Sequence, residues 1–455
     1  MVLAVLLMCF LSGHVTGEDL RCSDFMCTEP TSPMLRTLRF TTELGPCGHA
    51  FSTRPDLPWP SWDPGRPSVV IIPGRRPPAV QPSWVRNMAR ELLAAKQANV
   101  LAVDWLLPGE QELTEGARQV GEKLAEVIKV LLAKGSIPEM MHLVGFGAGA
   151  HVAGIAGAGL RGALGRITGL DPFAPAFAEA DPSVSLDFSD AQFVDVIHTN
   201  FKPNEPVEAL GASRSMGHVD FYVGSGNLLP GCPQGLIDRE KYVLCSHHRA
   251  HQLFTSSIRA VCPLTAFPCR STADFQKGLC THCNWPGLHT CPQLGFNIAW
   301  LPPDRPIPFQ PLTAIMGITS VAPFCVTPFL LELQIGGSSS LEAQLFIQLK
   351  SMNTRTSSML LSGSYPMLFE PTKKYQFLVS ADCDGDFQIM LLEFYAERLL
   401  YLDWRKKKII ISQMLLTRLP RKQGIAYQAG NITASEGDTQ EVHLNKVMVK
   451  EKGNI

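Results

Sequence analysis

The sequence predicts an α/β domain with a mostly parallel sheet, followed by a C-terminal antiparallel β-sandwich. Three observations lead to this fold class. The chain has 455 residues, which is more than one compact core usually holds. In its first part, continuous apolar runs alternate with amphipathic helical segments, a pattern typical of a parallel sheet covered on both faces. After a cysteine-rich segment, strand-like stretches with apolar residues at every second position follow one another.

Each element of the first domain follows from its apolar pattern. Continuous apolar runs predict strands at Ser68–Ile72, Asn99–Trp105, Met141–Val144, Ile167–Leu170 and Phe193–Ile197. Apolar residues spaced three and four apart predict helices at Trp84–Gln97, Gly116–Lys134 and Ala148–Leu160.

The second domain is expected to be built from strands alone. Its strand-like stretches are Leu330–Ile335, Ala343–Leu349, Phe387–Phe394 and Lys408–Ser412. The proline-rich segment Pro302–Pro308 predicts a linker, so the α/β domain is expected at residues 18–305 and the sandwich at 306–455.

The N-terminus and the cysteines predict a secreted, extracellular protein. Residues 1–17 form a short apolar run that ends in small residues, which is typical of a cleaved signal peptide. Of thirteen cysteines, Cys9 lies in that segment, and the even remainder favours disulfides. The pair Cys280 and Cys283 also has the spacing of half a zinc or redox motif, which such a context disfavours. The sequon at Asn431 predicts glycosylation, and a net charge of −1 gives no indication of nucleic-acid binding.

A glycine-rich corner between a predicted strand and a predicted helix carries the main functional question. The stretch Gly145-Phe-Gly147-Ala-Gly-Ala150 matches a dinucleotide-binding pattern, with Asp171 about 20 residues further on. A second interpretation is structural, since small residues let a helix pack closely on a sheet. A third is a hydrolase corner of the G-x-S-x-G type whose central nucleophile has become Gly147.

The third interpretation requires an acid and then a histidine further along the chain, and both are present. Asp171 follows the strand Ile167–Leu170, at the end of the strand where open sheets collect functional groups. His247 lies in Cys245-Ser-His-His-Arg249, which is expected to be a loop. The neighbouring His248 leaves the choice of histidine open, and the central position of His247 in C-x-H-x-R favours it. A turn former and a surface histidine are the structural alternatives for Asp171 and His247.

Several longer motifs then point to one family. They are Ala102-Val-Asp-Trp105, Gly149-Ala-His-Val-Ala-Gly154, Ile167-Thr-Gly-Leu-Asp-Pro172, Ser189-Asp-Ala-Gln-Phe-Val-Asp-Val-Ile-His198, Gly217-His-Val-Asp-Phe221, Pro230-Gly-Cys232, Ala266-Phe-Pro-Cys269 and Ala322-Pro-Phe-Cys325. With these motifs the chain resembles the pancreatic lipase family, and within it the phospholipase A1 branch, over nearly the whole mature sequence.

The resemblance implies an α/β-hydrolase domain followed by a lipoxygenase-like β-sandwich. It implies a Ser–Asp–His triad at positions 147, 171 and 247, with oxyanion N–H groups from Arg75 and Ala148. It also implies a short lid of twelve residues between bridged Cys232 and Cys245. The reaction of the branch needs no cofactor, and its substrates are the sn-1 esters of phosphatidylserine and lysophosphatidylserine.

The same resemblance implies two more bridges and a metal site. The bridges are Cys269–Cys280 and Cys283–Cys291, and Cys325 is expected to pair with Cys383 because the two share a domain. Pairing of Cys22, Cys27, Cys47 and Cys262 stays open. The side chains of Asp187 and Asp190 match the family's structural calcium ligands, and solvated loop carboxylates are the alternative.

The chain departs from the family at two places in the catalytic machinery. Gly147 provides no nucleophile, and no serine, threonine or cysteine lies between Gly145 and Gly159 to replace it. The oxyanion loop has Pro73-Gly74-Arg75 where the family has His-Gly-Phe. Glycine also tolerates the strained backbone of such a corner, so we expect Gly147 to stabilise the fold while it removes catalysis.

Two functions from different classes follow. The first is a secreted, catalytically silent protein that retains a surface for phospholipid, and in particular phosphatidylserine, or for a membrane. The basic run Arg405, Lys406, Lys407 and Lys408 fits anionic lipid or heparan sulfate, or is a solvated strand end. The second is an active phospholipase A1 with another source of nucleophile. Storage, or sequestration of a lipase partner, is a further hypothesis.

Overall fold

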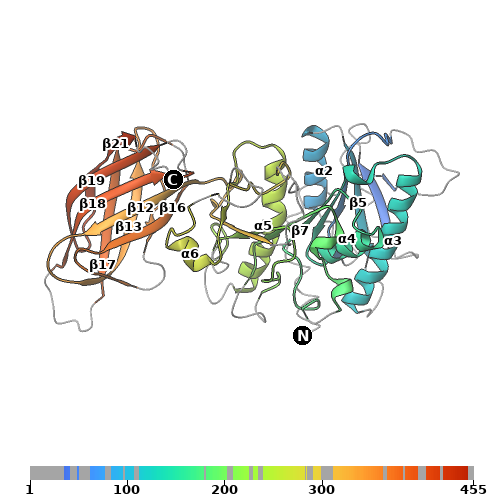
Figure 1. Ribbon diagram of the computed structural model, residues 1–455, viewed down its shortest axis with the longest axis horizontal. Coiled ribbons are helices and arrows are strands. Elements are labelled where there is room, and N and C mark those ends of the chain that lie inside the picture. Colours follow the sequence, from blue (N-terminus) through green and yellow to red (C-terminus); the bar gives the residue numbers. More distant parts are fainter. Residues whose placement is uncertain are drawn as a thin grey trace, which may run out of the picture. The chain divides into compact units, whose positions relative to one another are not determined.

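The structure is a computed structural model in which two compact units can be distinguished (Figure 1). It describes residues 35–40, 49–50, 62–76, 83–95, 98–106, 112–178, 181–201, 209–224, 229–233, 239–281, 283, 291–298, 311–361, 366–382, 385–397, 406–420 and 424–448. The first unit comprises Met1–Leu264, Gln293–Met316 and Ser320–Pro323. The second comprises Thr265–Pro292, Gly317–Thr319 and Phe324–Ile455.

The first unit is an α/β domain. Its strands are β1 (Leu35–Phe40), β2 (His49–Ala50), β3 (Ser68–Ile72), β4 (Arg75–Arg76), β5 (Asn99–Leu106), β6 (Met141–Phe146), β7 (Arg166–Leu170), β8 (Phe193–His198), β9 (Val219–Val223) and β11 (Leu312–Met316). Its α-helices are α2 (Ser83–Ala95), α3 (Leu113–Ala133), α4 (Ala148–Gly159) and α5 (Arg239–Ile258). Short 3₁₀ turns are η3 (Pro138–Met140), η4 (Pro182–Val184) and η5 (Phe188–Asp190).

These strands form one twisted sheet in the order β11-β9-β8-β7-β6-β3-β5-β1-β2, with β4 beside β5. Every pairing from β11 to β5 is parallel, and β1 and β2 add antiparallel strands at the far edge. The central strands β3 and β6 are buried along their whole length, as the continuous apolar runs predict. Helices α3 and α4 pack together, as do α2 and α5, and the two pairs cover opposite faces of the sheet (Figure 1).

Small side chains set how closely α4 approaches its surroundings. A Cβ on Gly149 would lie 2.1 Å from the carbonyl oxygen of Ile72, and one on Gly157 would lie 2.2 Å from that of Asp190. Such distances do not occur between real atoms, so α4 could not pack here with larger residues. The structural interpretation of the glycine-rich corner is therefore correct for α4, alongside its position at the functional site.

The second unit is an antiparallel sandwich. One sheet has the order β16-β12-β18-β19-β21 and the other β14-β13-β17-β20, with β15 also paired to β13. Its strands are β12 (Thr327–Ile335), β13 (Leu341–Lys350), β14 (Met359–Leu360), β15 (Met367–Phe369), β16 (Lys374–Ala381), β17 (Ile389–Ala396), β18 (Lys408–Arg418), β19 (Ile425–Ser435), β20 (Gln440–His443) and β21 (Asn445–Met448). The unit also contains β10 (Phe267–Pro268) and α6 (Thr272–Gln276).

Alternation along the strands builds the sandwich core. On β13, Leu341, Ala343, Leu345, Ile347 and Leu349 are buried, while the residues between them are exposed or half-buried. Burying one face of each strand removes the apolar side chains from water, and this is the main force that holds two such sheets together.

The predicted fold class is confirmed, with differences in single elements. Strand β11 (Leu312–Met316) pairs in parallel with β9, so these residues belong to the α/β sheet although the sandwich domain is predicted from residue 306. The predicted linker, the boundary at residues 305/306 and the signal peptide at 1–17 lie outside the described residues and stay predictions. In the part of the chain that is described, no helix has the length and apolar character needed to cross a bilayer.

Candidate active site

Asp171 and His247 lie in contact at one edge of the parallel sheet. The Oδ2 atom of Asp171 is 2.6 Å from Nδ1 of His247, and the two side chains are 0% and 9% exposed. Asp171 directly follows β7, and His247 lies within α5. The expected loop around His247 is therefore wrong. Helix α5 could not be predicted from the sequence because its apolar periodicity is weak. The helix buries His247, Arg249 and His251 along with its apolar residues.

Backbone donors hold the Asp171 carboxylate in place. Its Oδ1 atom accepts hydrogen bonds from the N–H groups of Thr199, at 2.7 Å, and Asn200, at 2.9 Å. Asp171 itself has φ = 45°, in the left-handed region that aspartate tolerates better than most residues. With both carboxylate oxygens engaged and the side chain fully buried, Asp171 is unable to receive a ribose hydroxyl. The dinucleotide interpretation of the corner is therefore wrong.

Gly147 lies next to the Nε2 side of the His247 ring. A Cβ at position 147 would lie 3.2 Å from Nε2 of His247 and 3.5 Å from Cε1. Gly147 precedes α4 with φ = 56° and ψ = −120°, at the sharp strand-to-helix turn that positions a nucleophile in hydrolases. The structure thus brings positions 147, 171 and 247 together in the order that a relay of nucleophile, base and acid requires.

The backbone at position 147 favours glycine over serine. A residue with a side chain in this left-handed region carries strain on the order of 1 kcal/mol or more. We therefore expect Gly147→Ser to lower the melting temperature of the protein in thermal unfolding. A variant that melts at a higher temperature would show that the glycine does not relieve strain.

Phe146 packs against His247, and Trp84 packs against the neighbouring rings of Phe146 and His251. The ring of Phe146 lies 4.4 Å from that of His247, and Trp84 stacks on His251 at 4.6 Å. His248, the alternative candidate, makes no hydrogen bond to Asp171, and its Nδ1 lies 3.1 Å from Nε2 of His251. Of the two adjacent histidines, His247 is therefore the one that pairs with the acid.

Gly211 is part of this arrangement, although the sequence analysis did not identify it. A Cβ on Gly211 would lie between 2.4 and 2.6 Å from all three atoms of the Asp171 carboxylate group. No motif near Leu210-Gly-Ala212 marks this role, because Gly211 meets Asp171 through the tertiary fold.

Gly211→Ala is expected to lower the free energy of unfolding by about 2 kcal/mol, the usual cost of overpacking a buried site. The control is Gly65→Ala, where a Cβ would meet a single atom of Asp63 at 3.4 Å. Chemical denaturation of both variants measures the difference. Equal stability of Gly211→Ala and the unmodified chain would contradict the close packing of Gly211 on Asp171.

The predicted oxyanion loop lies beside the glycine corner. A Cβ on Gly74 would be 3.4 Å from the backbone nitrogen of Gly149 and 3.8 Å from that of Ala148. The residues after Gly74 form β4, in which Arg75 pairs with Trp105 of β5. Ala148 is thus near the turn that carries Arg75, and the roles of their N–H groups as oxyanion donors stay predictions.

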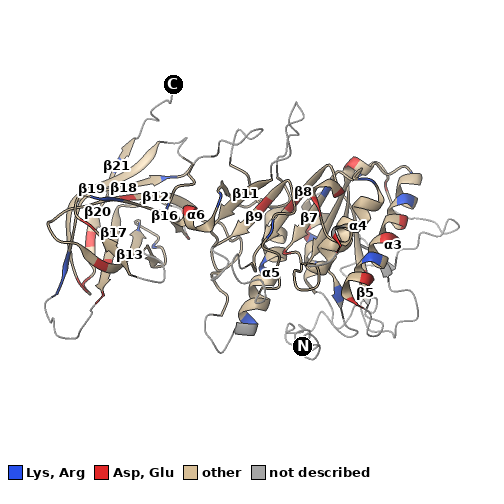
Figure 2. Ribbon diagram, turned by 60° about the horizontal axis from the view of Figure 1, so that its bottom comes forward, with Lys and Arg blue, Asp and Glu red and all other residues tan. Residues whose placement is uncertain are grey.

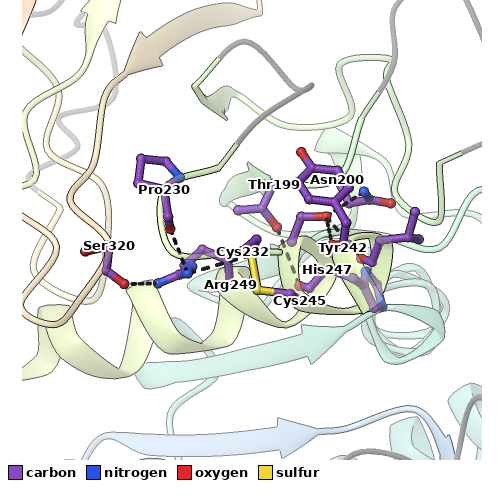
Figure 3. Close-up of a disulfide and its surroundings, with 11 residues drawn as sticks. Thr199, Asn200, Pro230, Cys232, Tyr242, Cys245, His247, Arg249 and Ser320 are labelled. Atoms are coloured by element: carbon purple, nitrogen blue, oxygen red, sulfur yellow. Dashed lines mark hydrogen bonds between the residues drawn. A yellow bond between two sulfur atoms is a disulfide. The ribbon is translucent and has the colours of Figure 1, made fainter. Parts of the chain in front are cut away.

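A disulfide links α5 to the segment before it. Cys232 and Cys245 are bonded, and the Arg249 guanidinium beside them donates to the carbonyl oxygens of Pro230 and Ser320 (Figure 3). These contacts fix the helix that carries His247. Residues 234–238 of the predicted lid lie outside the described residues, so its function as a lid stays a prediction.

The other predicted cysteine pairs show a mixed outcome. The bridges Cys269–Cys280 and Cys283–Cys291 are present, so the zinc or redox interpretation of Cys280 and Cys283 is wrong. Cys262 and Cys325 are also disulfide-bonded. Cys22, Cys27, Cys47 and Cys383 lie outside the described residues, and the pairing of Cys325 with Cys383 stays a prediction.

Asp187 and Asp190 form a helix cap. Asp187 accepts from the N–H of Ser189, and Oδ2 of Asp190 accepts from the N–H of Asp187 at 2.7 Å. Burial raises the pKa of Asp190 to about 7, the bond from Asp187 N–H opposes this rise, and the Asp187 carboxylate adds to it. Calcium takes six to eight oxygen ligands, and the described residues contain no group of three acidic, histidine or cysteine side chains placed to bind a metal. Calcium binding here stays a prediction, and Asp190 is too buried to be a solvated carboxylate.

The basic run on the sandwich has acidic neighbours. Lys406 pairs with Asp438 at 2.5 Å, and the backbone N–H of Lys407 donates to Glu436. Arg405 lies outside the described residues, Lys408 begins β18, and Asn431 is exposed on β19. Mixed charge also occurs elsewhere, as Figure 2 shows for α3, where both signs occur along one helix. The local acids reduce the positive field expected from this run.

Buried histidines predict a loss of stability in acid. Burial lowers the pKa of His142 and His251 well below the usual value, that of His151 and His248 to about 4, and that of His218. The unfolded chain binds protons at these side chains near pH 6.5, whereas the folded chain does not. The stability that these histidines contribute is therefore fully present above pH 6.5, and it is lost as the pH falls towards 4.

The variant His151→Gln isolates one of these contributions. His151 donates from Nε2 to the carbonyl oxygen of Phe173 and accepts at Nδ1 from the N–H of Leu186, and glutamine can do both without titrating. We expect the melting temperature of His151→Gln to fall less steeply between pH 6.5 and 4 than that of the unmodified chain. Parallel curves would contradict a depressed pKa at His151.

Asp190 acts in the opposite sense, since its raised pKa removes stability as the pH rises towards 7.

Comparison with known proteins places these residues within a matched region. The sequence model of the family described as Lipase matches residues 40–305, which include positions 147, 171 and 247. Lipase member H-A of Xenopus laevis is 33% identical over 328 residues, covering 70% of this chain and 69% of that protein. Phospholipase A1 member A is 32% identical in Bos taurus, covering 72% of this chain and 73% of that protein. The Homo sapiens protein of that name is also 32% identical, and 74% of each chain is covered.

Proposed function

Since the chain belongs to the pancreatic lipase family, in its phospholipase A1 branch, we propose that it is a secreted protein that binds phospholipid without hydrolysing it. One observation carries the proposal. Asp171 and His247 are arranged as the acid and base of a hydrolase, and the position that faces Nε2 of His247 holds Gly147. Loss of the nucleophile alone costs about 10⁶ in turnover in a serine protease, while the binding surface does not depend on it.

Phosphatidylserine is the phospholipid that we propose this protein binds. Two of the relatives carry the name phospholipase A1, so a glycerophospholipid is the ligand class to test. The sandwich lysines Lys406 and Lys408 are exposed and add positive charge near a membrane, although Asp438 offsets part of it. Secretion is supported by the disulfides of the described residues, because such bonds persist in oxidising compartments.

Sedimentation with liposomes of diether lipids tests binding separately from hydrolysis. Diether phosphatidylserine and diether phosphatidylcholine differ in net charge, and neither has a carboxylic ester that a phospholipase A1 could cleave. We expect the protein to sediment with both at low salt and more strongly with phosphatidylserine. Absence of sedimentation with either lipid would overturn the proposal, and equal sedimentation would overturn the preference for the anionic lipid. A triple variant of Lys406, Lys407 and Lys408 to glutamine tests the contribution of the sandwich.

An active phospholipase A1 is the second candidate, and the intact Asp171–His247 pair favours it. A chain with no remaining use for a general base need not keep an imidazole 2.6 Å from a fully buried carboxylate. In that case another group would supply the nucleophile that cleaves the sn-1 ester of phosphatidylserine. Release of fatty acid from ester lipids by the unmodified chain, and its loss in His247→Gln, would establish this alternative.

A further inference from the structure

The disulfide between Cys232 and Cys245, here called the α5 bridge, joins a buried residue to a partly exposed one. Cys232 is 5% exposed, whereas Cys245 lies on α5 and is half-buried. In thiol–disulfide exchange a thiolate from outside attacks one sulfur, and the other sulfur leaves with the electron pair of the broken bond. The difference in exposure makes Cys245 the residue open to attack and Cys232 the leaving group.

A buried cation lies beside the sulfur that would leave. The Nη2 atom of Arg249 is 3.7 Å from Sγ of Cys232, and Arg249 is 4% exposed (Figure 3). A guanidinium keeps its positive charge in proteins, and a cation next to a cysteine lowers the pKa of the thiol because it stabilises the thiolate. A leaving thiol with a lower pKa leaves faster. The charge on Arg249 therefore favours cleavage in which Cys232 departs.

Backbone carbonyls hold Arg249 in this position independently of the sulfur atoms. Its Nη1 atom donates to the carbonyl oxygen of Ser320 at 3.1 Å, and Nη2 donates to that of Pro230 at 3.0 Å. We therefore expect the guanidinium to stay beside Cys232 when the S–S bond breaks. Because Arg249 and Cys232 are both buried, water weakens the attraction between guanidinium and thiolate less than it would on the surface.

A second bridge matches the α5 bridge in burial and span but not in charge. In Cys269–Cys280, Cys269 is 7% exposed and Cys280 is half-buried. The two cysteines are 11 residues apart in sequence, against 13 in the α5 bridge. Here the carbonyl oxygen of Ser271 lies 3.2 Å from Sγ of Cys269, and the negative end of this dipole disfavours a thiolate. The adjacent Arg270 is exposed, so water screens its charge.

We propose that the α5 bridge is a thiol-exchange site for small-molecule thiols. The thiolate attacks Sγ of Cys245 and forms a new S–S bond with it, while the Cys232–Cys245 bond breaks and Cys232 leaves as a thiolate beside Arg249. One disulfide forms and one is lost, so the thiol is the only co-reactant. The exchange adds a group two positions before His247 and removes the covalent link between α5 and the preceding segment. This chemistry goes beyond the proposed function and does not depend on it.

Reduced glutathione tests the proposal on the full, unmodified chain. After incubation under native conditions, free thiols are alkylated and the modified peptides are identified by mass spectrometry. We expect glutathione on Cys245 and the alkyl group on Cys232, formed about tenfold faster than adducts of Cys269–Cys280. In urea the α5 bridge should react no faster than the second bridge, because burial and Arg249 no longer act on it.

Each other outcome of this experiment contradicts the proposal. Glutathione attached to Cys232 would show that the leaving group is wrongly assigned. Absence of exchange at the α5 bridge, or exchange no faster than at Cys269–Cys280, would overturn the site. An advantage that persists in urea would trace the reactivity to the local sequence and would also overturn it. These comparisons use the unmodified chain alone, so they hold even where a variant does not fold.

Variants of Arg249 test the role of the charge directly. Arg249→Met removes the cation and keeps a long side chain, and we expect the exchange rate of the α5 bridge to fall about tenfold. Arg249→Lys keeps a cation and should react faster than Arg249→Met. Arg259→Met is the control, because it removes an exposed arginine that pairs with Glu91 just beyond the same helix, and it should leave the rate unchanged. An undiminished rate in folded Arg249→Met would contradict the role assigned to this charge.

Discussion

Gly147→Ser is expected to release fatty acid from phosphatidylserine liposomes at least about 10³-fold faster than the unmodified chain. A Cβ at this position lies 3.2 Å from Nε2 of His247, so a serine oxygen comes within reach of the base. The base is already oriented by Asp171 at 2.6 Å, and Asp171 is held by the backbone of Thr199 and Asn200. The missing side chain is therefore the first barrier to acyl transfer.

Two further variants make this result interpretable. Gly147→Ser combined with His247→Gln keeps the new hydroxyl but removes the base, and it should lose the gain. A folded Gly147→Ser that stays silent would contradict the claim that one side chain blocks catalysis. The altered loop Pro73–Arg75 would then be the next cause to test, by adding Pro73→His and Arg75→Phe to the serine variant.

Asp220→Ala is expected to lower the free energy of unfolding by about 3–5 kcal/mol. Asp220 and His198 are both fully buried, with Oδ1 of Asp220 at 2.8 Å from Nε2 of His198. Asp220 also accepts from the N–H groups of Met216 and Gly217. His198 also donates from Nδ1 to the carbonyl oxygen of Ala212 at 2.8 Å. Alanine would leave the imidazole and two N–H groups without their acceptor, and urea denaturation measures the loss.

An exposed ion pair provides the matched control for this prediction. Asp438 pairs with Lys406 at 2.5 Å, but both side chains are more than half exposed. Solvent screens such a pair, so Asp438→Ala should change the stability by less than about 1 kcal/mol. If the two aspartate variants were equally stable, the buried pair would not contribute to the fold in the way that its contacts indicate.

The central strands and the sandwich could be predicted because their patterns are local. The continuous apolar run Ser68–Ile72 and the alternating run Leu341–Lys350 reflect how each strand is buried, on both faces or on one. Strand β11 could not be assigned in this way. Its residues Leu312–Met316 look like any buried strand, and their parallel pairing with β9 joins segments far apart in the sequence.

The three site positions and their order along the chain could be predicted from the sequence, but the residues that hold them in place could not. Position 147, Asp171 and His247 each follow a recognisable local pattern. Helix α5 was missed because polar residues face inward along it. Gly211 could not be predicted because its contact with the Asp171 carboxylate forms only in the folded chain, and no sequence motif marks it. Local chemistry is visible in a sequence, whereas the close approach of distant segments requires the folded chain.

Fatty-acid release by the unmodified secreted chain is the measurement that tests the central claim most directly. The protein is incubated with liposomes of ester-linked phosphatidylserine, and bound protein and free fatty acid are measured in the same sample. We expect the protein to be bound and the fatty acid to remain at the level of the His247→Gln variant. Release above that level would show that the chain is an active enzyme, and would contradict a lipid-binding protein silenced at Gly147.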